Sequence, residues 1–145
     1  MPYRHTQRGP WIVIPCLLFA ALDAAIAWQT GQWAPLAVLV FLVAVAVMFS
    51  SLTVEVEGNE LRWRFGPGWW TYRIAIDDIE TVAAVRNKWW NGLGIRKGPG
   101  FWLYNVAGLD AVELRLRSGE VRRIGTDDPQ GLAAALKAAA PRRVL

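Results

Sequence analysis

Two long apolar runs at the start of the chain constrain its fold more than any other feature. The first, Trp11 to Trp28, has 18 residues and one charge, at Asp23; the second, Ala34 to Leu52, has 19 residues and none. An α-helix rises about 1.5 Å per residue, so each run would span roughly 27 to 29 Å, close to the ~30 Å core of a bilayer. Residues 36–49 carry no polar side chain on any face, unlike a surface helix of a soluble domain. The pattern predicts two transmembrane helices.

Basic residues flank this pair of runs, while the short segment between them, residues 29–33, is uncharged and contains a glycine. That segment predicts a tight helical hairpin. Arg4 and Arg8 precede the first run, and Arg62 and Arg64 follow the second. Because Lys and Arg are enriched in the cytoplasmic segments of membrane proteins, we expect both termini in the cytoplasm.

A cleaved signal peptide is the alternative interpretation of the first run. Its start is basic, and Ala25-Ile26-Ala27 fits the A-x-A cleavage pattern. However, the apolar run is long for a signal-peptide core, and it contains Asp23. We therefore favour a retained helix.

Asp23 is the one charged residue within either run. An Asp at the centre of a bilayer costs about 2.5 to 3.5 kcal/mol on insertion scales, so Asp23 is a candidate intramembrane ion or proton site. Alternatively, it lies near the outer end of its helix, five residues before Trp28, and reaches water or the partner helix. We favour this second interpretation because neither run supplies a charged partner.

The remaining 93 residues are much more polar, with 14 Lys/Arg and 11 Asp/Glu, and their apolar residues alternate with polar ones. This period of two predicts β-strands with one buried face. The predicted strands are Leu52–Val56, Leu61–Phe65, Trp70–Ile76, Glu80–Arg86, Phe101–Val106, Val112–Arg117 and Val121–Thr126. A C-terminal helix should follow, with Asp128 as its cap, Pro129 in its first turn and Pro141 at its end.

About seven antiparallel strands followed by one helix, within about 90 residues, resemble a pleckstrin-homology (PH) domain. Two helices leading directly into such a domain resemble the small bacterial membrane proteins that carry a bacterial PH domain. The stretches that resemble signatures of this group are Gly94-Ile95-Arg96, Trp102-Leu103-Tyr104-Asn105-Val106, Gly108-Leu109-Asp110-Ala111-Val112 and Arg123-Ile124-Gly125-Thr126-Asp127-Asp128-Pro129.

The resemblance covers residues 51–140 and implies a bent β-sandwich capped by its C-terminal helix, a place in the bacterial inner membrane and no known catalytic activity. It implies no particular ligand. The expected segments are a cytoplasmic tail at residues 1–10, a two-helix transmembrane hairpin at 11–52, a PH-like domain at 53–140 and a tail at 141–145.

A glycine-rich stretch lies between the fourth and fifth predicted strands. Its Gly92-x-Gly94-x-x-x-Gly98 spacing matches neither a dinucleotide-binding nor a phosphate-binding loop, and a strand rather than a helix follows it. We therefore expect a long connection with a turn at Gly98-Pro99-Gly100.

Basic residues gather around two tryptophans in the same connection, and no acidic residue lies between Thr81 and Val106. Lys and Arg beside tryptophan suit an anionic membrane surface, where each cation contributes about 1 kcal/mol. The predicted lipid- or partner-binding residues are Arg86, Lys88, Trp89, Trp90, Arg96 and Lys97. Trp69-Trp70 is a second pair. Alternation along a strand would bury one tryptophan of each pair, and the exposed one would need lipid, a protein partner or a second copy of the chain.

Several function classes are disfavoured. One cysteine, Cys16, and one histidine, His5, which we place in the N-terminal tail, argue against a disulfide, a zinc site or a histidine-based catalytic triad. The acidic pairs Asp77-Asp78 and Asp127-Asp128 fall at strand ends, where Asp ordinarily serves turns and caps. Basic strand residues near the C-terminus are interleaved with Glu, which argues against nucleic-acid binding.

We therefore predict no catalytic residue, metal or cofactor. The predicted function is a membrane-anchored, non-enzymatic binding or assembly module acting through anionic lipid, a protein partner or self-association. The alternative is an accessory subunit of a membrane enzyme or transporter complex that uses Asp23 or the acidic pairs.

Overall fold

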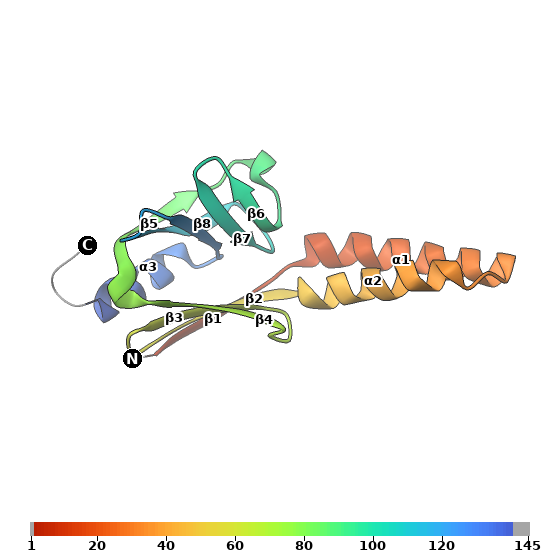
Figure 1. Ribbon diagram of the computed structural model, residues 1–145, viewed down its shortest axis with the longest axis horizontal. Coiled ribbons are helices and arrows are strands. Elements are labelled where there is room, and N and C mark those ends of the chain that lie inside the picture. Colours follow the sequence, from red (N-terminus) through yellow and green to blue (C-terminus); the bar gives the residue numbers. More distant parts are fainter. Residues whose placement is uncertain (1, 141–145) are drawn as a thin grey trace.

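Two antiparallel helices project from one end of a two-sheet domain in the computed structural model, which describes residues 2–140 (Figure 1). The helices are α1 (Pro10–Thr30) and α2 (Ala34–Met48), and we call them the stalk. The domain consists of strands β1 to β9 and the C-terminal helix α3. The predicted C-terminal tail at 141–145 and the helix-ending Pro141 lie outside the described residues.

Only α1, among the described helices, is long and apolar enough to cross a membrane by length and composition. The second predicted span was too long: α2 has 15 residues and ends at Met48. The physical reason is that Leu52 belongs to a strand, where its backbone pairs with a neighbouring strand and its side chain is buried in the domain core.

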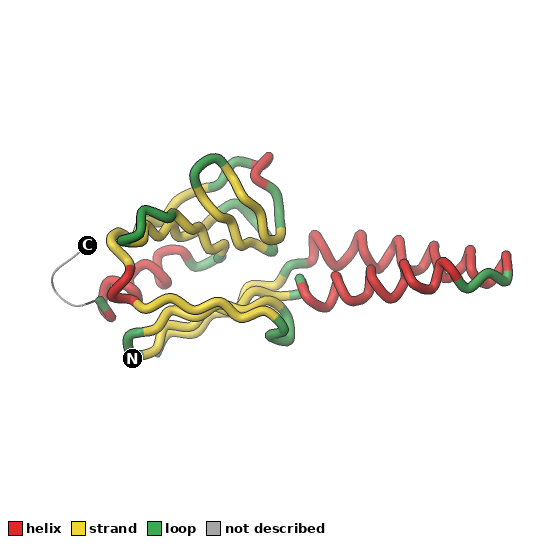
Figure 2. Tube along the Cα trace, in the orientation of Figure 1, coloured by secondary structure: helices red, strands yellow, loops and turns green. Residues whose placement is uncertain are grey.

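The N-terminal residues form a strand, β1 (Tyr3–Arg8), rather than the predicted tail. β1 pairs along its whole length with β2 (Ser51–Glu57), from Tyr3 opposite Val56 to Arg8 opposite Ser51. The stalk is therefore inserted between two neighbouring antiparallel strands, and Figure 2 shows its two helices continuing from the ends of those strands. The polar sequence of β1 hides this strand, because it lacks the apolar alternation used to recognise the others.

Sheet A has the order β1-β2-β3-β4, with β3 at Glu60–Phe65 and β4 at Trp70–Ala75. Its inner face follows the predicted alternation, and Leu61, Trp63 and Phe65 are fully buried. A two-residue turn at Gly58-Asn59 joins β2 to β3. Residues 66–68, Gly-Pro-Gly, lie in the turn between β3 and β4.

Sheet B has the order β5-β8-β9-β7-β6. Its strands are β5 (Ile79–Arg86), β6 (Gly94–Gly98), β7 (Phe101–Asn105), β8 (Asp110–Leu116) and β9 (Val121–Gly125). Two features differ from the predicted seven antiparallel strands. β7 and β9 are parallel, and the predicted glycine-rich connection contains β6, which pairs with β7. Glycine is depleted in strands, so composition concealed β6.

The C-terminal helix α3 (Pro129–Ala139) confirms the predicted cap and helix. The Asp128 side chain accepts a hydrogen bond from the Gly131 N–H over 3.1 Å. Leu132 and Leu136 are fully buried, and α3 packs against β5 and β8 of sheet B and against β2 of sheet A. The helix therefore helps to close the core between the two sheets.

The base of the stalk is packed directly on the domain. The Gly9 N–H donates to the Ser50 carbonyl over 2.9 Å, and the Phe49 ring lies 5.3 Å from the ring of Phe65. Gly66 has a φ of 52°, and a Cβ there would meet the backbone carbonyl oxygens of Val47 and Met48. Stalk and domain are thus joined by close contacts rather than by a linker.

Candidate functional site

The most exposed tryptophan of the domain, Trp89, lies with Trp90 in a short 3-10 turn, η2 (Trp89–Asn91), between β5 and β6. Trp89 is 79% exposed and Trp90 61%, and their rings meet edge to face at 5.8 Å. The Lys88 ammonium lies 4.9 Å from the Trp90 ring. The expectation that one tryptophan of this pair faces the core is wrong, because strand alternation does not apply within the turn.

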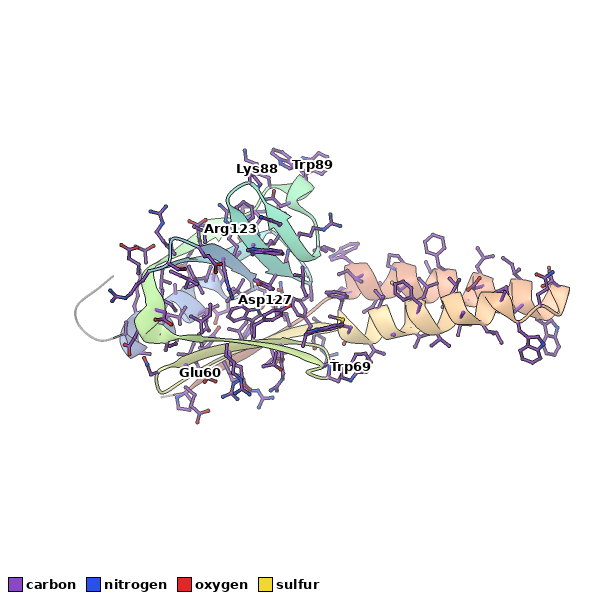
Figure 3. The ribbon with its side chains drawn as sticks, viewed as in Figure 1. Glu60, Trp69, Lys88, Trp89, Arg123 and Asp127 are labelled. Atoms are coloured by element: carbon purple, nitrogen blue, oxygen red, sulfur yellow. The ribbon has the colours of Figure 1, made fainter. Side chains whose placement is uncertain are left out.

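The second tryptophan pair is also exposed on both members. Trp69, in the turn between β3 and β4, is 61% exposed, and Trp70, the first residue of edge strand β4, is 53% exposed. Figure 3 places Trp69 and Trp89 at the end of the domain from which the stalk projects, on opposite sides of the stalk. The sequence gives no hint that these distant pairs lie at one end of the domain.

The four predicted basic residues do not share one environment. Lys88 and Lys97 each lie near a tryptophan ring, Lys97 at 5.8 Å from Trp102. The Arg96 Nε donates to the Leu93 carbonyl over 2.7 Å. Arg86 lies 3.7 Å from an Asp110 carboxylate oxygen, which partly offsets its charge.

A surface hollow of about 390 Å³ brings part of the predicted site together. Its lining includes Arg96 and Lys97 and no acidic residue. The lining residues, which we call the basic hollow, are Trp90, Asn91, Arg96, Lys97, Gly98, Pro99, Phe101 and Leu103. The hollow thus combines cationic and apolar groups, a composition that suits an anionic amphiphile.

One residue that sequence reasoning missed contacts the lining of this hollow. The Arg123 guanidinium lies 4.0 Å from the centre of the Phe101 ring and donates to Glu113 over 2.7 Å. Arg123 also donates to the buried Asn87 over 3.1 Å. Because Glu113 compensates its charge, Arg123 packs against Phe101, a lining residue of the hollow, without adding a free cation.

Asp23 lies on the side of α1 that faces α2, one turn from the buried Ala20. Its Oδ2 atom is buried and has no hydrogen-bond partner among the described residues. The carboxyl group therefore lies in the seam of the stalk rather than on its outer surface.

The acidic pairs serve turns and caps. Asp77, within the 3-10 turn η1 (Ile76–Asp78), accepts a hydrogen bond from the Asn59 side chain over 2.9 Å. Asp128 caps α3 and also accepts from the Tyr3 hydroxyl over 2.8 Å, while Asp127 contacts His5. His5 thus lies in an ordered strand, contrary to its predicted place in a tail. Across residues 2–140 no three His, Cys, Asp or Glu side chains group as metal ligands would.

Two tyrosines have shifted acidities. The pKa of Tyr3 is raised, first by burial and then by its hydrogen bond to Asp128. Burial also raises the pKa of Tyr104, whose ring packs against Trp63 at 5.2 Å and Tyr72 at 4.8 Å in the core. Neither tyrosine lines the basic hollow.

Comparison with known proteins gives no family assignment: no protein-family model and no curated protein sequence matches this chain.

Proposed function

We propose that this protein is a membrane-anchored, non-catalytic binding module whose β-domain meets the anionic lipid headgroups of the bacterial inner membrane. The observation that carries the proposal is the position of the exposed Trp89, next to Lys88, at the end of the domain from which an apolar stalk projects. Tryptophan favours the boundary between headgroups and acyl chains, and nearby cations favour anionic lipid.

The exposed surface of the stalk supports its insertion into a bilayer. A water-soluble helix hides its apolar side chains, whereas most of those on α1 and α2 are uncovered. The large exposed apolar residues are Trp11, Ile14, Leu17, Leu18, Phe19, Leu22, Ile26, Trp28, Trp33, Val38, Val40, Phe41, Val43 and Val47. Trp28 and Trp33, at the tip, are 91% and 81% exposed, as expected of anchors in the far headgroup layer.

The lengths of the two helices are compatible with one hairpin crossing the bilayer twice. With 21 residues, α1 is about 31 Å long, and α2 with 15 residues is about 22 Å long. Phe49 and Ser50 at the base and the turn at the tip extend the shorter arm. Both termini would then lie on the same side, and Arg4 and Arg8 favour the cytoplasm.

The pairing of β1 with β2 favours a retained α1 over a cleaved signal peptide. Cleavage after Ala27 would remove β1 from sheet A and expose the edge of β2. The intact mass of the membrane-bound protein tests this: a mass that includes β1 is expected, and a chain beginning at Trp28 would contradict it.

The PH-like assignment belongs to the same proposal. Two packed sheets and a C-terminal helix closing the core support it. The added strand β1 and the parallel pair of β7 and β9 depart from a simple seven-stranded antiparallel sandwich.

The proposal is tested by amide hydrogen exchange of the full chain in nanodiscs of anionic or zwitterionic lipid. We expect residues 88–98 to be more protected in anionic discs, and added salt to remove the difference because it screens exposed charges. The variant K88Q/K97Q should lose this protection. Arg96 is left unchanged because its side chain also bonds the backbone of its own loop.

A matched control removes two exposed cations elsewhere, in R73Q/R115Q, and should keep the protection. Equal exchange in both kinds of disc would overturn the lipid role. If the protection of residues 88–98 instead rises with protein concentration, this surface serves self-association.

A further inference from the structure

The turn between β3 and β4 is a second candidate membrane contact. We call residues 66–70, with sequence Gly-Pro-Gly-Trp-Trp, the tryptophan turn. Trp69 and Trp70 are both more than half exposed, and neither belongs to the basic hollow. Two adjacent exposed indoles form an apolar patch that water does not favour.

The tryptophan turn is held rigidly against the stalk. The Gly66 N–H donates to the Ser51 carbonyl over 2.8 Å, and the Gly68 N–H donates to the Phe65 carbonyl over 3.0 Å. Gly66 also abuts the last carbonyls of α2, where any side chain would collide. The two tryptophans therefore stay at the level where the stalk leaves the domain.

Basic residues at this end of sheet A indicate which kind of ligand would bind the tryptophan turn. A Cβ at Gly68 would lie 3.3 Å from the Arg64 Cδ, so the Arg64 side chain lies against the tryptophan turn. Arg8, the exposed last residue of β1, lies at the same end of sheet A but on its other edge, with β2 and β3 between it and the turn. Glu55 lies 3.6 Å from Arg64 and is shared with Arg4, at 3.2 Å, so it offsets this basic character only in part. Cations beside exposed tryptophan, next to an apolar stalk, match anionic phospholipid.

We infer that the tryptophan turn, with Arg8 and Arg64, binds anionic phospholipid headgroups on the opposite side of the stalk from η2. This inference rests on the proposed insertion of the stalk in the bilayer. Two contacts on opposite sides of a rigid stalk would hold the domain in one orientation on the membrane, and would leave the far end of the domain facing the cytoplasm.

Site-specific lipid quenching tests the inference in the full-length protein. Cys16 is the only cysteine, so C16A provides a background into which W69C, W89C or S118C introduces one labelling site. Each protein is labelled with a small fluorophore and placed in anionic vesicles containing lipid that carries a quencher near its headgroup. We expect loss of fluorescence at positions 69 and 89, and none at Ser118 in the turn between β8 and β9.

Four quenching outcomes separate this inference from the proposed function. Quenching at both 69 and 89 supports both. Quenching at 89 alone overturns the second contact and leaves the lipid role of η2 intact. Quenching at 69 alone supports the second contact and removes that role, while quenching at neither position overturns both. Adding R8Q/R64Q should reduce quenching at 69 but not at 89; an equal reduction at both positions would contradict a local charge contribution.

Discussion

At the scale of residues, three polar side chains of β1 join the N-terminal segment to the C-terminal half of the chain. Tyr3 donates to Asp128, His5 contacts Asp127, and the Gln7 amide donates to the Ala107 carbonyl over 3.0 Å. Their spacing of two places all three on the face of β1 that meets the rest of the domain. These contacts hold β1 in place with polar rather than apolar groups.

The raised pKa of Tyr3 predicts a loss of stability at alkaline pH. Its folded-state pKa lies above the unfolded value of about 10, so its stabilising contribution is present below pH ~10 and is lost as pH rises through the folded-state pKa. We expect Tyr3→Phe to reduce the decline in the free energy of unfolding that begins above about pH 10. Denaturant titrations in detergent measure this, and identical declines in both proteins would contradict the assignment. Part of the decline should remain, because the pKa of Tyr104 is also raised.

The turn between β6 and β7 depends on Gly100, whose φ is 82°. Gly100→Val should lower the free energy of unfolding by about 1–3 kcal/mol, because a β-branched residue is strained there. Gly100→Asn should cost less, since Asn tolerates this region. Gly98→Val should also destabilise, but through collision with the Phe101 ring. Thermal unfolding measures the stability of all three variants. Variants that keep full stability but lose lipid binding would show that these glycines are needed for ligand binding rather than for the turn.

At the scale of elements, the start of α3 combines two roles in one carboxylate. Asp128 caps the helix through the Gly131 N–H and accepts the Tyr3 hydroxyl from β1. The first role follows from local sequence, whereas the second links elements at opposite ends of the chain. A change at Asp128 therefore affects both the helix and the attachment of β1.

Asp128→Ala should lower the free energy of unfolding by at least the ~1 kcal/mol expected for a lost cap. Asp128→Asn should cost less, because its amide oxygen can still accept a hydrogen bond. In a Tyr3→Phe background the cost of Asp128→Ala should shrink, since part of the loss is shared. Denaturant titration of the four proteins measures this coupling, and strictly additive costs would contradict a shared role.

At the scale of the whole molecule, pairing of β1 with β2 requires both stalk helices to leave the domain from the same end (Figure 1). If the stalk enters a membrane, its two helices must therefore either cross the bilayer once each or form a hairpin that returns to the same face without crossing. Charge alone predicted cytoplasmic termini from a few basic residues, while the strand pairing imposes a common side for residues 3 and 56 by geometry.

Reporter fusions before residue 1 and after residue 145 test this topology. We expect both fusions to be active only in the cytoplasm, because β1 and β2 stay paired and Arg4 and Arg8 resist translocation. The variant R4Q/R8Q keeps β1 but weakens the charge signal. In any molecules whose topology is inverted, both termini should therefore lie together on the other side of the membrane. Termini found on opposite sides would disprove the pairing of β1 with β2 in the membrane.

Local chemistry in the sequence was enough to determine the apolar stalk, most strands of the domain and the capped helix α3. Each depends on neighbouring residues: a run without charges, alternation with a period of two, or an Asp before a Pro. The exposed basic and aromatic residues at Lys88, Trp89 and Trp90 could also be named, because their composition is unusual for a loop. Tertiary structure alone decided that residues 3–8 form a strand, that Leu52 leaves the stalk and that β7 runs parallel to β9. It also placed Trp69 and Trp89 at one end of the domain. Such placements depend on the energies of contacts between residues far apart in the chain, and these energies cannot be inferred from a local sequence pattern.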